Sequence, residues 1–436
     1  MKSVVITPRW GCVAKASILS AALAVLAACS SYPGLTSRVA AAAAQGGKVT
    51  VTVWTSASGP YPQIQAKLAR DLAAKYPEIT VKLDYVDWTQ IQAKLLVGVA
   101  GGSAPDMVLL PTRYAPAFIE QHLVVPVDHK ALSLASDADI PKLFLPGVAS
   151  ALDFGSKFYF LPTELTWLGM YYNKDMLDAA GIGNIPDTWE EVGQIGSKFT
   201  RIGPKGVEQA GLTIGRWGPF TAFWFLSFIR SAGQDWIKDG QPNFSNPQCV
   251  AALQVYADLY NRYRAAVASF DGQENFEASK IAFMPGLSVA LVDFRKRGKL
   301  PFELGVSEYP HLATGRPANI AYAWGYFVLA SSKHQEEAWK VANEFTSPEN
   351  APYWFKTGSL FVPRGQEWVS DMPRTDSQLR TLMAGLSHAT MELAHPKYDD
   401  IVREINRASD DMVLHGLGAA SAMAELDSRL AKILRQ

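Results

Sequence analysis

The folded part of the chain opens with an alternation of strand and helix patterns, which constrains the fold more than any other feature. Val49–Trp54 is rich in β-branched residues, as strands are, and Gln63–Tyr76 repeats apolar residues every four positions, as one face of a helix does. A strand (Ile79–Tyr85), a helix (Gln90–Ala100) and another strand (Pro105–Leu110) follow. Strands alternating with helices predict a parallel sheet with right-handed crossovers, and therefore an α/β fold.

This alternation also identifies candidate ligand-binding residues. Ligands of parallel sheets bind beyond the carboxyl ends of the strands. Two such ends here are Trp54–Tyr61 and Pro111–Tyr114. Among the side chains there that can stack on a ligand or hydrogen-bond to it, we nominate Trp54, Ser56, Ser58, Arg113 and Tyr114.

The N-terminal region has the features of a processing signal. Basic residues precede the apolar run Ala16–Ala28, which is too short to span a bilayer comfortably. The run ends in Leu26-Ala27-Ala28-Cys29, the pattern of a bacterial lipobox. We therefore expect residues 1–28 to be a signal peptide, Cys29 to carry the lipid and residues 29–47 to form a tether. The alternative is ordinary secretion with cleavage near Val39–Ala44.

Cysteine usage, charge and motif content narrow the functional classes. With Cys12 removed and Cys29 lipidated, Cys249 has no partner, so we expect a buried thiol and no intrachain disulfide. Lys plus Arg and Asp plus Glu balance at 41 each, which gives no electrostatic case for a nucleic acid or an anionic membrane surface as partner. The seven His residues are isolated, and nucleotide-binding and nucleophile motifs are absent, so we expect no metal site, no cofactor and no enzyme.

A longer pattern gives a more specific indication. Gly169–Val192 reads GMYYNKDMLDAAGIGNIPDTWEEV: a short apolar strand, a capped helix, and a second helix that opens with Thr188 and Glu191 at capping-box spacing. The whole pattern resembles a segment of the bacterial solute-binding proteins of ABC importers, the sugar-binding family that includes maltose-binding protein.

Further segments extend this resemblance over nearly all of the chain after the tether. They are Phe276–Gly286, Lys333–Trp339, Phe345–Glu349 and Phe361–Arg364. Ser279 replaces a usual Gly, and Trp324 stands where the family often has Gly, so the loops at these two positions are expected to differ.

The resemblance implies two discontinuous α/β lobes joined by hinge strands, with a cleft between them. It implies an N-terminal lobe of residues 48–161 and 283–322, and a C-terminal lobe of residues 162–282 and 323–436. A chain of about 390 residues after the tether is of a suitable length for two domains. We expect a monomer that closes on its ligand and then docks on the permease subunits of an importer.

Further candidate residues come partly from the resemblance and partly from aromatic content. Trp217 and Phe220 lie in a Gly/Pro-broken aromatic stretch, which could either wall a pocket or pack internally; the following Phe225, Phe228 and Ile229 fit a core helix. The family resemblance adds Glu164, Gly286, Trp324, Gly325, Trp354 and Arg364. For Glu164 the alternative is a hinge hydrogen bond, for Arg364 a packing ion pair, and for the two Trp residues internal packing.

The predicted function is capture of a carbohydrate by a lipid-anchored, extracytoplasmic protein of the plasma membrane. Within the same fold, Arg113 or Arg364 could instead hold the phosphate of a glycerophosphodiester or a sugar phosphate, and Glu164 could favour an amino sugar. Two distant alternatives are a secreted glycoside hydrolase, whose carboxylate pair sequence alone does not reveal, and a structural envelope lipoprotein. The sequence does not name the ligand.

Overall fold

The structure is a computed structural model that describes residues 48–87, 89–144, 148–149, 152–216, 218–270, 272–298, 300–358, 360–364 and 376–435. The predicted signal peptide, most of the tether, the lipidation residue Cys29 and the candidate Trp217 lie outside the described residues. Residues Thr50–Gln436 form one compact unit.

The predicted alternation at the start of the fold is confirmed. Its elements are β1 (Val49–Ser56), α3 (Tyr61–Lys75), β2 (Ile79–Val86), α4 (Ile91–Ala100), β3 (Met107–Pro111), η2 (Thr112–Tyr114) and α5 (Ala115–Glu120). Strands β1 and β3 pair in parallel, with Val53 opposite Met107. The carboxyl ends of these two strands therefore meet at one edge of the sheet, as the sequence predicted.

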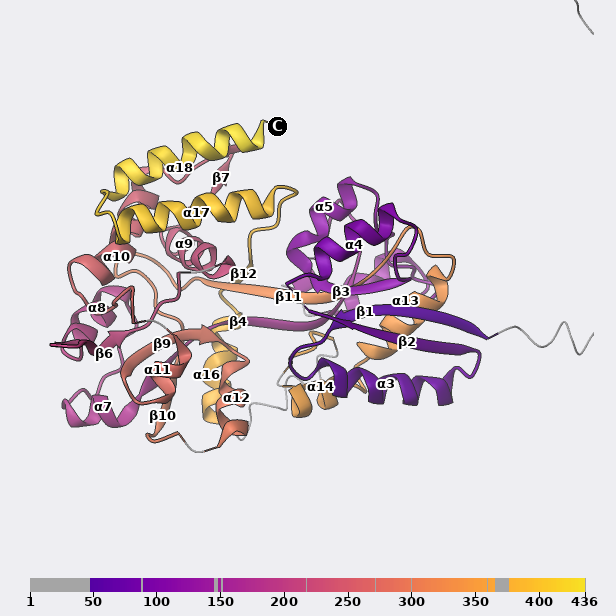
Figure 1. Ribbon diagram of the computed structural model, residues 1–436, viewed down its shortest axis with the longest axis horizontal. Coiled ribbons are helices and arrows are strands. Elements are labelled where there is room, and N and C mark those ends of the chain that lie inside the picture. Colours follow the sequence, from indigo (N-terminus) through magenta and orange to yellow (C-terminus); the bar gives the residue numbers. More distant parts are fainter. Residues whose placement is uncertain are drawn as a thin grey trace, which may run out of the picture. The chain divides into compact units, whose positions relative to one another are not determined.

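Two long strands run through the middle of the unit (Figure 1). They are β4 (Leu161–Asn173) and β11 (Asn319–Val328), which pair antiparallel along most of the length of β11. The sheet order is β2-β1-β3-β11-β4-β9-β6-β5, so these two strands connect the elements at its two ends. Their pairing is irregular between Trp324 and Gly325.

The remaining elements complete the unit. Between β4 and β11 the structure has α7 (Lys174–Ala179), α8 (Trp189–Ser197), β5 (Arg201–Gly203), β6 (Gly206–Leu212), α9 (Pro219–Ser231), β7 (Ile237–Lys238), β8 (Gln241–Pro242), α10 (Pro247–Asn261), α11 (Gln273–Glu277), β9 (Ile281–Leu287), α12 (Ala290–Arg297) and β10 (Leu304–Ser307). The 3₁₀ helix η3 (Asp137–Leu143) precedes β4. After β11 come α13 (Gln335–Phe345), α14 (Ala351–Gly358), α16 (Ser377–Leu386), β12 (Ala389–Met391), α17 (Tyr398–Val413) and α18 (Ala419–Leu434).

Strand pairing supports a division into lobes that differs from the predicted one. The predicted boundaries placed 283–322 in the N-terminal lobe, yet β9 and β10 both pair with the second half of β4. They placed 323–436 in the C-terminal lobe, yet the second half of β11 pairs with β3, and α13 and α14 pack on α3. We propose a division into 50–163 with 324–364, and 164–323 with 376–435. The sequence motifs located the strands that pass between the proposed lobes, β4 and β11. They did not show which other elements lie beside these strands.

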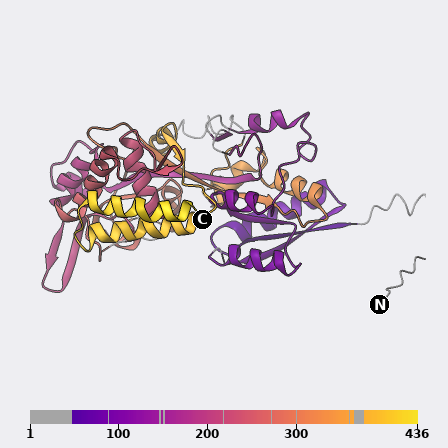
Figure 2. The same ribbon diagram turned by 90° about the horizontal axis from the view of Figure 1, so that it is seen from above.

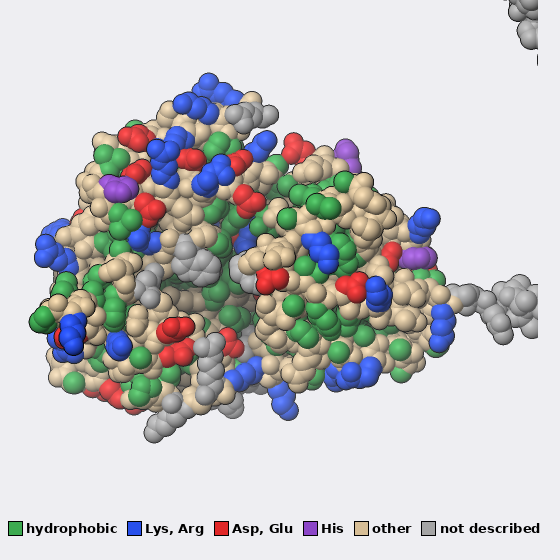
Figure 3. Space-filling view, in the orientation of Figure 1, with side chains coloured by type: hydrophobic (Ala, Val, Ile, Leu, Met, Phe, Trp, Pro, Cys, Tyr) green, Lys and Arg blue, Asp and Glu red, His purple; other side chains and the backbone are tan. Residues whose placement is uncertain are grey.

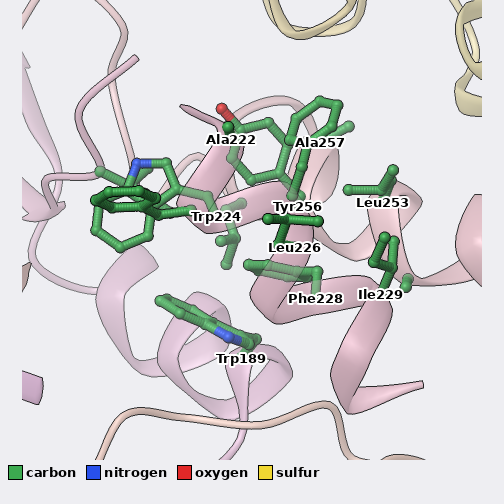
Figure 4. Close-up of a cluster of buried hydrophobic side chains, with 14 of the residues drawn as sticks. Trp189, Ala222, Trp224, Leu226, Phe228, Ile229, Leu253, Tyr256 and Ala257 are labelled. Atoms are coloured by element: carbon green, nitrogen blue, oxygen red, sulfur yellow. The ribbon is translucent and has the colours of Figure 1, made fainter. Parts of the chain in front are cut away.

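Helix α9 is the centre of the largest hydrophobic core. It contacts α10, α17 and β11, which explains why it is apolar on all sides. Phe225, Phe228 and Ile229 are fully buried, so their prediction as core residues is confirmed. Trp189 of α8 stacks on Phe228 with ring centroids 5.0 Å apart, and Tyr256 of α10 meets the same ring edge-on (Figure 4).

The C-terminal helices cover this core. Helices α17 and α18 lie side by side in both ribbon views (Figures 1 and 2) and contact α9 and α10. On α10, Cys249 is a free cysteine with no exposed surface, as predicted, and burial raises the pKa of its thiol to about 12. Within the described ranges, no helix is both long and apolar enough to cross a membrane.

The segment Gly169–Val192 forms the structure that its pattern predicts. It supplies the end of β4, then α7 and α8. The Asn173 side chain caps α7 by accepting a hydrogen bond from the Met176 backbone N–H at 3.0 Å. The Thr188 side chain caps α8 in the same way, accepting from Glu191 N–H at 3.3 Å.

Candidate ligand-binding site

A cavity of about 300 Å³ lies where β4 and β11 pass the ends of β1 and β3. Its lining comes from segments that are far apart in the sequence: Ser56, Ser58, Gly59, Tyr61, Arg113, Glu164, Pro219, Phe220, Phe223, Tyr322, Trp324 and Leu360. In the space-filling view, hydrophobic side chains gather in a hollow near the middle of the unit (Figure 3). The cavity falls in the size range of small-molecule sites in proteins.

Aromatic rings form walls on two sides of the cavity. On one side, Tyr61 at the start of α3 lies 6.0 Å from Trp324 of β11 between ring centroids. On the other, Phe223 of α9 stacks on Tyr322 of β11 at 5.6 Å, and Phe220 meets Phe223 edge-on at 5.5 Å. Tyr322 and Trp324 both face the cavity because alternate residues of a strand point to the same side.

Glu164 is a carboxyl group buried among these rings. It lies on β4 directly opposite Trp324 and is only 4% exposed. The Tyr61 hydroxyl donates a hydrogen bond to Glu164 Oε2 at 2.9 Å. Burial raises the pKa of Glu164 to about 7, and the hydrogen bond from Tyr61 opposes that shift only in part.

Arg113 brings a cation to the cavity and is bound to a second buried carboxylate. Its Nη1 donates to both carboxylate oxygens of Glu392, each at 3.0 Å. Glu392 directly follows β12, whose parallel pairing with β11 holds it in place. Glu392 raises the pKa of Arg113, while burial raises the pKa of Glu392 to about 7 against the opposing effect of the guanidinium. The rings of Tyr114, Tyr322 and Tyr398 surround the guanidinium within 6 Å.

The loop after β1 adds small hydroxyl groups. Ser58 N–H donates to Ser56 Oγ at 3.1 Å, which fixes the turn that leads into α3. Ser56 is buried, whereas Ser58 and Gly59 are exposed. The cavity therefore combines apolar ring faces with a few hydrogen-bonding groups, an arrangement typical of binding sites for polar small molecules.

Six predicted site residues line this cavity together. They are Ser56, Ser58, Arg113, Glu164, Phe220 and Trp324. Gly286 lines a neighbouring cavity of about 460 Å³, which shares Phe220 with the first. Whether any of these residues contacts a ligand stays a prediction.

Five other candidates are not among the residues that line the cavity. Trp54 packs against α4 beneath Lys94, and Tyr114 stacks on Phe118 beside the Arg113 guanidinium. The Gly325 Cα lies so close to Phe160 that an added Cβ would come within 2.9 Å of its ring.

The last two candidates are held by backbone and side-chain oxygens elsewhere. Trp354 is fully buried, and its Nε1–H donates to the Phe345 carbonyl oxygen at 2.7 Å. Arg364 donates to Thr346 Oγ1 at 2.8 Å and to Asn343 Oδ1 at 3.0 Å.

The sequence reasoning did not nominate six of the lining residues or the carboxylate behind them: Gly59, Tyr61, Pro219, Phe223, Tyr322, Leu360 and Glu392. Tyr61 lies in the strand-end segment Trp54–Tyr61, and Tyr322 lies two positions before Trp324, so both carried a signal that was available. Phe223 was not nominated, because it lies among the apolar residues of α9, which fit a core helix. Glu392 had no sequence signal, because it reaches Arg113 only through the pairing of β12 with β11.

Comparison with known proteins identifies the family. The family described as "Bacterial extracellular solute-binding protein" matches residues 54–352. The chain belongs to this family. Its members bind solutes and are not enzymes, so this chain is a solute-binding protein and not an enzyme.

Individual relatives agree with this assignment. A protein of Brucella abortus (strain 2308), described as a binding protein, is 25% identical over 400 residues, which covers 89% of this chain and 94% of the relative. The mannitol-binding protein of Pseudomonas aeruginosa is 26% identical over 313 residues, which covers 69% and 70%. The structure of the sugar-binding protein MalE of Xanthomonas citri superposes with a TM-score of 0.76 at 22% identity, covering 89% and 98%. The solute-binding protein therefore has the α/β periplasmic-binding-protein fold, as predicted.

Proposed function

We propose that this solute-binding protein captures a carbohydrate in the cavity beside β4 and β11 and delivers it to an ABC importer. The observation that carries the proposal is the pairing of ring walls with buried hydrogen-bonding groups. The C–H faces of a sugar stack on rings such as Trp324 and Tyr322, while its hydroxyls bond to groups such as Glu164. Two relatives are compatible with this ligand class, one named for mannitol and one, MalE, for sugar.

Capture would proceed by closure of the two proposed lobes. The cavity residues come from both: Tyr61, Arg113 and Trp324 from one, and Phe220, Phe223 and Tyr322 from the other. A ligand that contacts both groups favours the closed arrangement by the difference between its affinities for the closed and open forms. Bending would occur where β4 and β11 pass from one proposed lobe to the other, near the irregular pairing at Trp324 and Gly325.

Attachment to the membrane would come from the N-terminal region. We propose that Cys29 carries the lipid and that residues 29–47 let the binding unit move at the membrane surface, close to a permease. Mass spectrometry of the protein from its host membrane tests this point. A mature chain that begins after Cys29, without a lipid, would contradict it.

A ligand screen by calorimetry tests the proposed function directly. The protein lacking residues before Gln45 is titrated with mannitol, arabino-oligosaccharides, malto-oligosaccharides, an amino sugar and a glycerophosphodiester. We expect micromolar binding of at least one uncharged member, which corresponds to about −8 kcal/mol. Binding of the glycerophosphodiester with no binding of any sugar would contradict the proposal. Small-angle scattering with saturating ligand then tests closure, and an unchanged radius of gyration would count against it.

A further inference from the structure

The charge balance of the cavity points to one residue that sets the class of ligand. Of the described residues that line the cavity, Arg113 is the one cationic side chain. It is 6% exposed, so its charge has little access to water. Glu392 lies behind it, is not among the lining residues, and presents both carboxylate oxygens to Arg113 Nη1 at 3.0 Å.

Glu392 pairs with the charge of the Arg113 guanidinium, but one N–H donor of that guanidinium stays unbonded within the described part of the chain. Arg113 Nε is buried and has no hydrogen-bond partner among the described residues. An Arg side chain keeps its proton in proteins, so contact with the ionised carboxylate of Glu392 makes a neutral pair. The pair can still donate a hydrogen bond to a hydroxyl or ring oxygen, but it offers no net positive charge to a ligand anion. A buried anion beside it would meet two carboxyl groups, Glu164 and Glu392.

We propose that Glu392 is a specificity-determining residue: by pairing with Arg113 it neutralises and orients the guanidinium, so that the site accepts uncharged polyhydroxyl ligands and rejects phosphorylated ones. The inference rests on the proposed function of the same site. Glu392 acts through Arg113 and is a positioning residue, because it is not among the residues that line the cavity. It supplies the repulsive element that discrimination between similar ligands requires.

The test is the variant Glu392→Gln in the full chain, which keeps the shape of the side chain and removes its charge. Titrations at pH 8 keep the carboxyl of the wild-type Glu392 ionised, since its pKa is about 7. The probes are mannitol, maltose, their phosphorylated forms and inorganic phosphate. We expect wild type to bind an uncharged probe and no phosphorylated one. In E392Q we expect about tenfold weaker binding of the uncharged probe and new binding of its phosphorylated form.

A matched control is the variant Asp235→Asn. Asp235 pairs with Arg230, whose side chain is 14% exposed, and neither residue lines the cavity. D235N should leave both the affinity and the ligand preference unchanged. A switch of preference in D235N would show that the effect is general and would contradict the assignment to Glu392.

A double variant keeps the proposal testable if Glu392→Gln fails to fold. Removing both partners of a buried ion pair is tolerated better than removing one, so Arg113→Gln with Glu392→Gln should fold. It should bind the uncharged probe weakly and no phosphorylated probe. Phosphate binding by this double variant, or an unchanged preference in E392Q, would overturn the inference. Wild type that binds no sugar at all would instead overturn the proposed function.

Discussion

The cavity and the core around α9 are built from the same kinds of residue but differ in their polar groups. Both are lined by Trp, Tyr and Phe, and α9 contributes to both, with Phe220 and Phe223 at the cavity and Phe228 in the core. In the core, hydroxyls are paired with each other, as Tyr309 is with Ser227 at 2.9 Å. At the cavity, buried carboxyl groups have pKa values raised to about 7. Aromatic content alone therefore does not distinguish the cavity from the core, whereas buried carboxyl groups beside the rings do.

The largest effect should come from the core. Phe228→Ala removes a fully buried ring that packs on Trp189 and Tyr256, and it should lower the free energy of unfolding by about 3–5 kcal/mol. Urea denaturation followed by circular dichroism measures this. Phe220→Ala, at the partly exposed edge of the cavity, should cost less than half as much. Equal losses for the two variants would remove the distinction between core and cavity.

The next effect is the pH dependence that Glu164 contributes. Its folded-state pKa of about 7 lies above the usual 4.5, so the folded protein binds the proton more tightly than the unfolded chain. The stabilisation is therefore complete below about pH 4.5 and is lost as the pH rises through 7. Relative to Glu164→Gln, wild type should lose about 3 kcal/mol of stability between pH 4.5 and pH 8.

Comparison of the two proteins at each pH isolates Glu164 from Glu392, which titrates in the same range. Urea denaturation at intervals of half a pH unit measures the difference. A constant difference in stability between wild type and E164Q across this range would show that Glu164 is ionised throughout.

The aromatic walls give a matched pair of variants. Trp324 and Trp354 both lie 6.0 Å from the Tyr61 ring, but only Trp324 is among the residues that line the cavity. Trp324→Leu should weaken binding of the best sugar from the screen by more than tenfold, or about 2 kcal/mol. Trp354→Leu should lower stability and change affinity less than about threefold. If calorimetry showed that Trp354→Leu weakens sugar binding more than Trp324→Leu does, Trp324 would not form a wall of the binding site.

The smallest effect is expected from a single hydroxyl at the cavity rim. Ser58→Ala removes an exposed group, and one neutral hydrogen bond contributes about 0.5–1.5 kcal/mol, so the sugar affinity should fall by about three- to tenfold. Ser197 is not among the lining residues, and its hydroxyl donates to the Gln194 carbonyl oxygen, so Ser197→Ala should not change the affinity. If Ser58→Ala lowered the sugar affinity more than Trp324→Leu does, hydrogen bonds, and not ring faces, would dominate binding.

The sequence predicted those parts of the site that depend on local order. The rule for strand ends placed Ser56, Ser58 and Arg113 at one cavity, because β1 and β3 are parallel neighbours. The same rule also nominated Trp54, but Trp54 lies two residues before the end of β1 and packs on α4 beside Gly98. Family resemblance supplied Glu164 and Trp324.

The features that the sequence did not predict depend on contacts between residues that are far apart in the sequence. Arg113 and Glu392 are 279 positions apart, and no local pattern in either segment indicates the other. The proposed lobe division is a related case: β11 begins beside β12 and ends beside β3, so one continuous strand would belong to both proposed lobes. Such features follow from strand pairing, which motifs do not encode.

The buried thiol of Cys249 has a practical consequence for measuring closure. It has no exposed surface, and with a pKa near 12 it holds almost no thiolate at neutral pH, so it should not react with maleimide dyes. Once Cys12 and Cys29 are removed with the N-terminal region, no other cysteine remains in the chain. Cysteines introduced at exposed positions on α3 and α17 would then accept a donor and an acceptor dye without background labelling. The native chain is thus ready to become a fluorescent reporter for its own ligand.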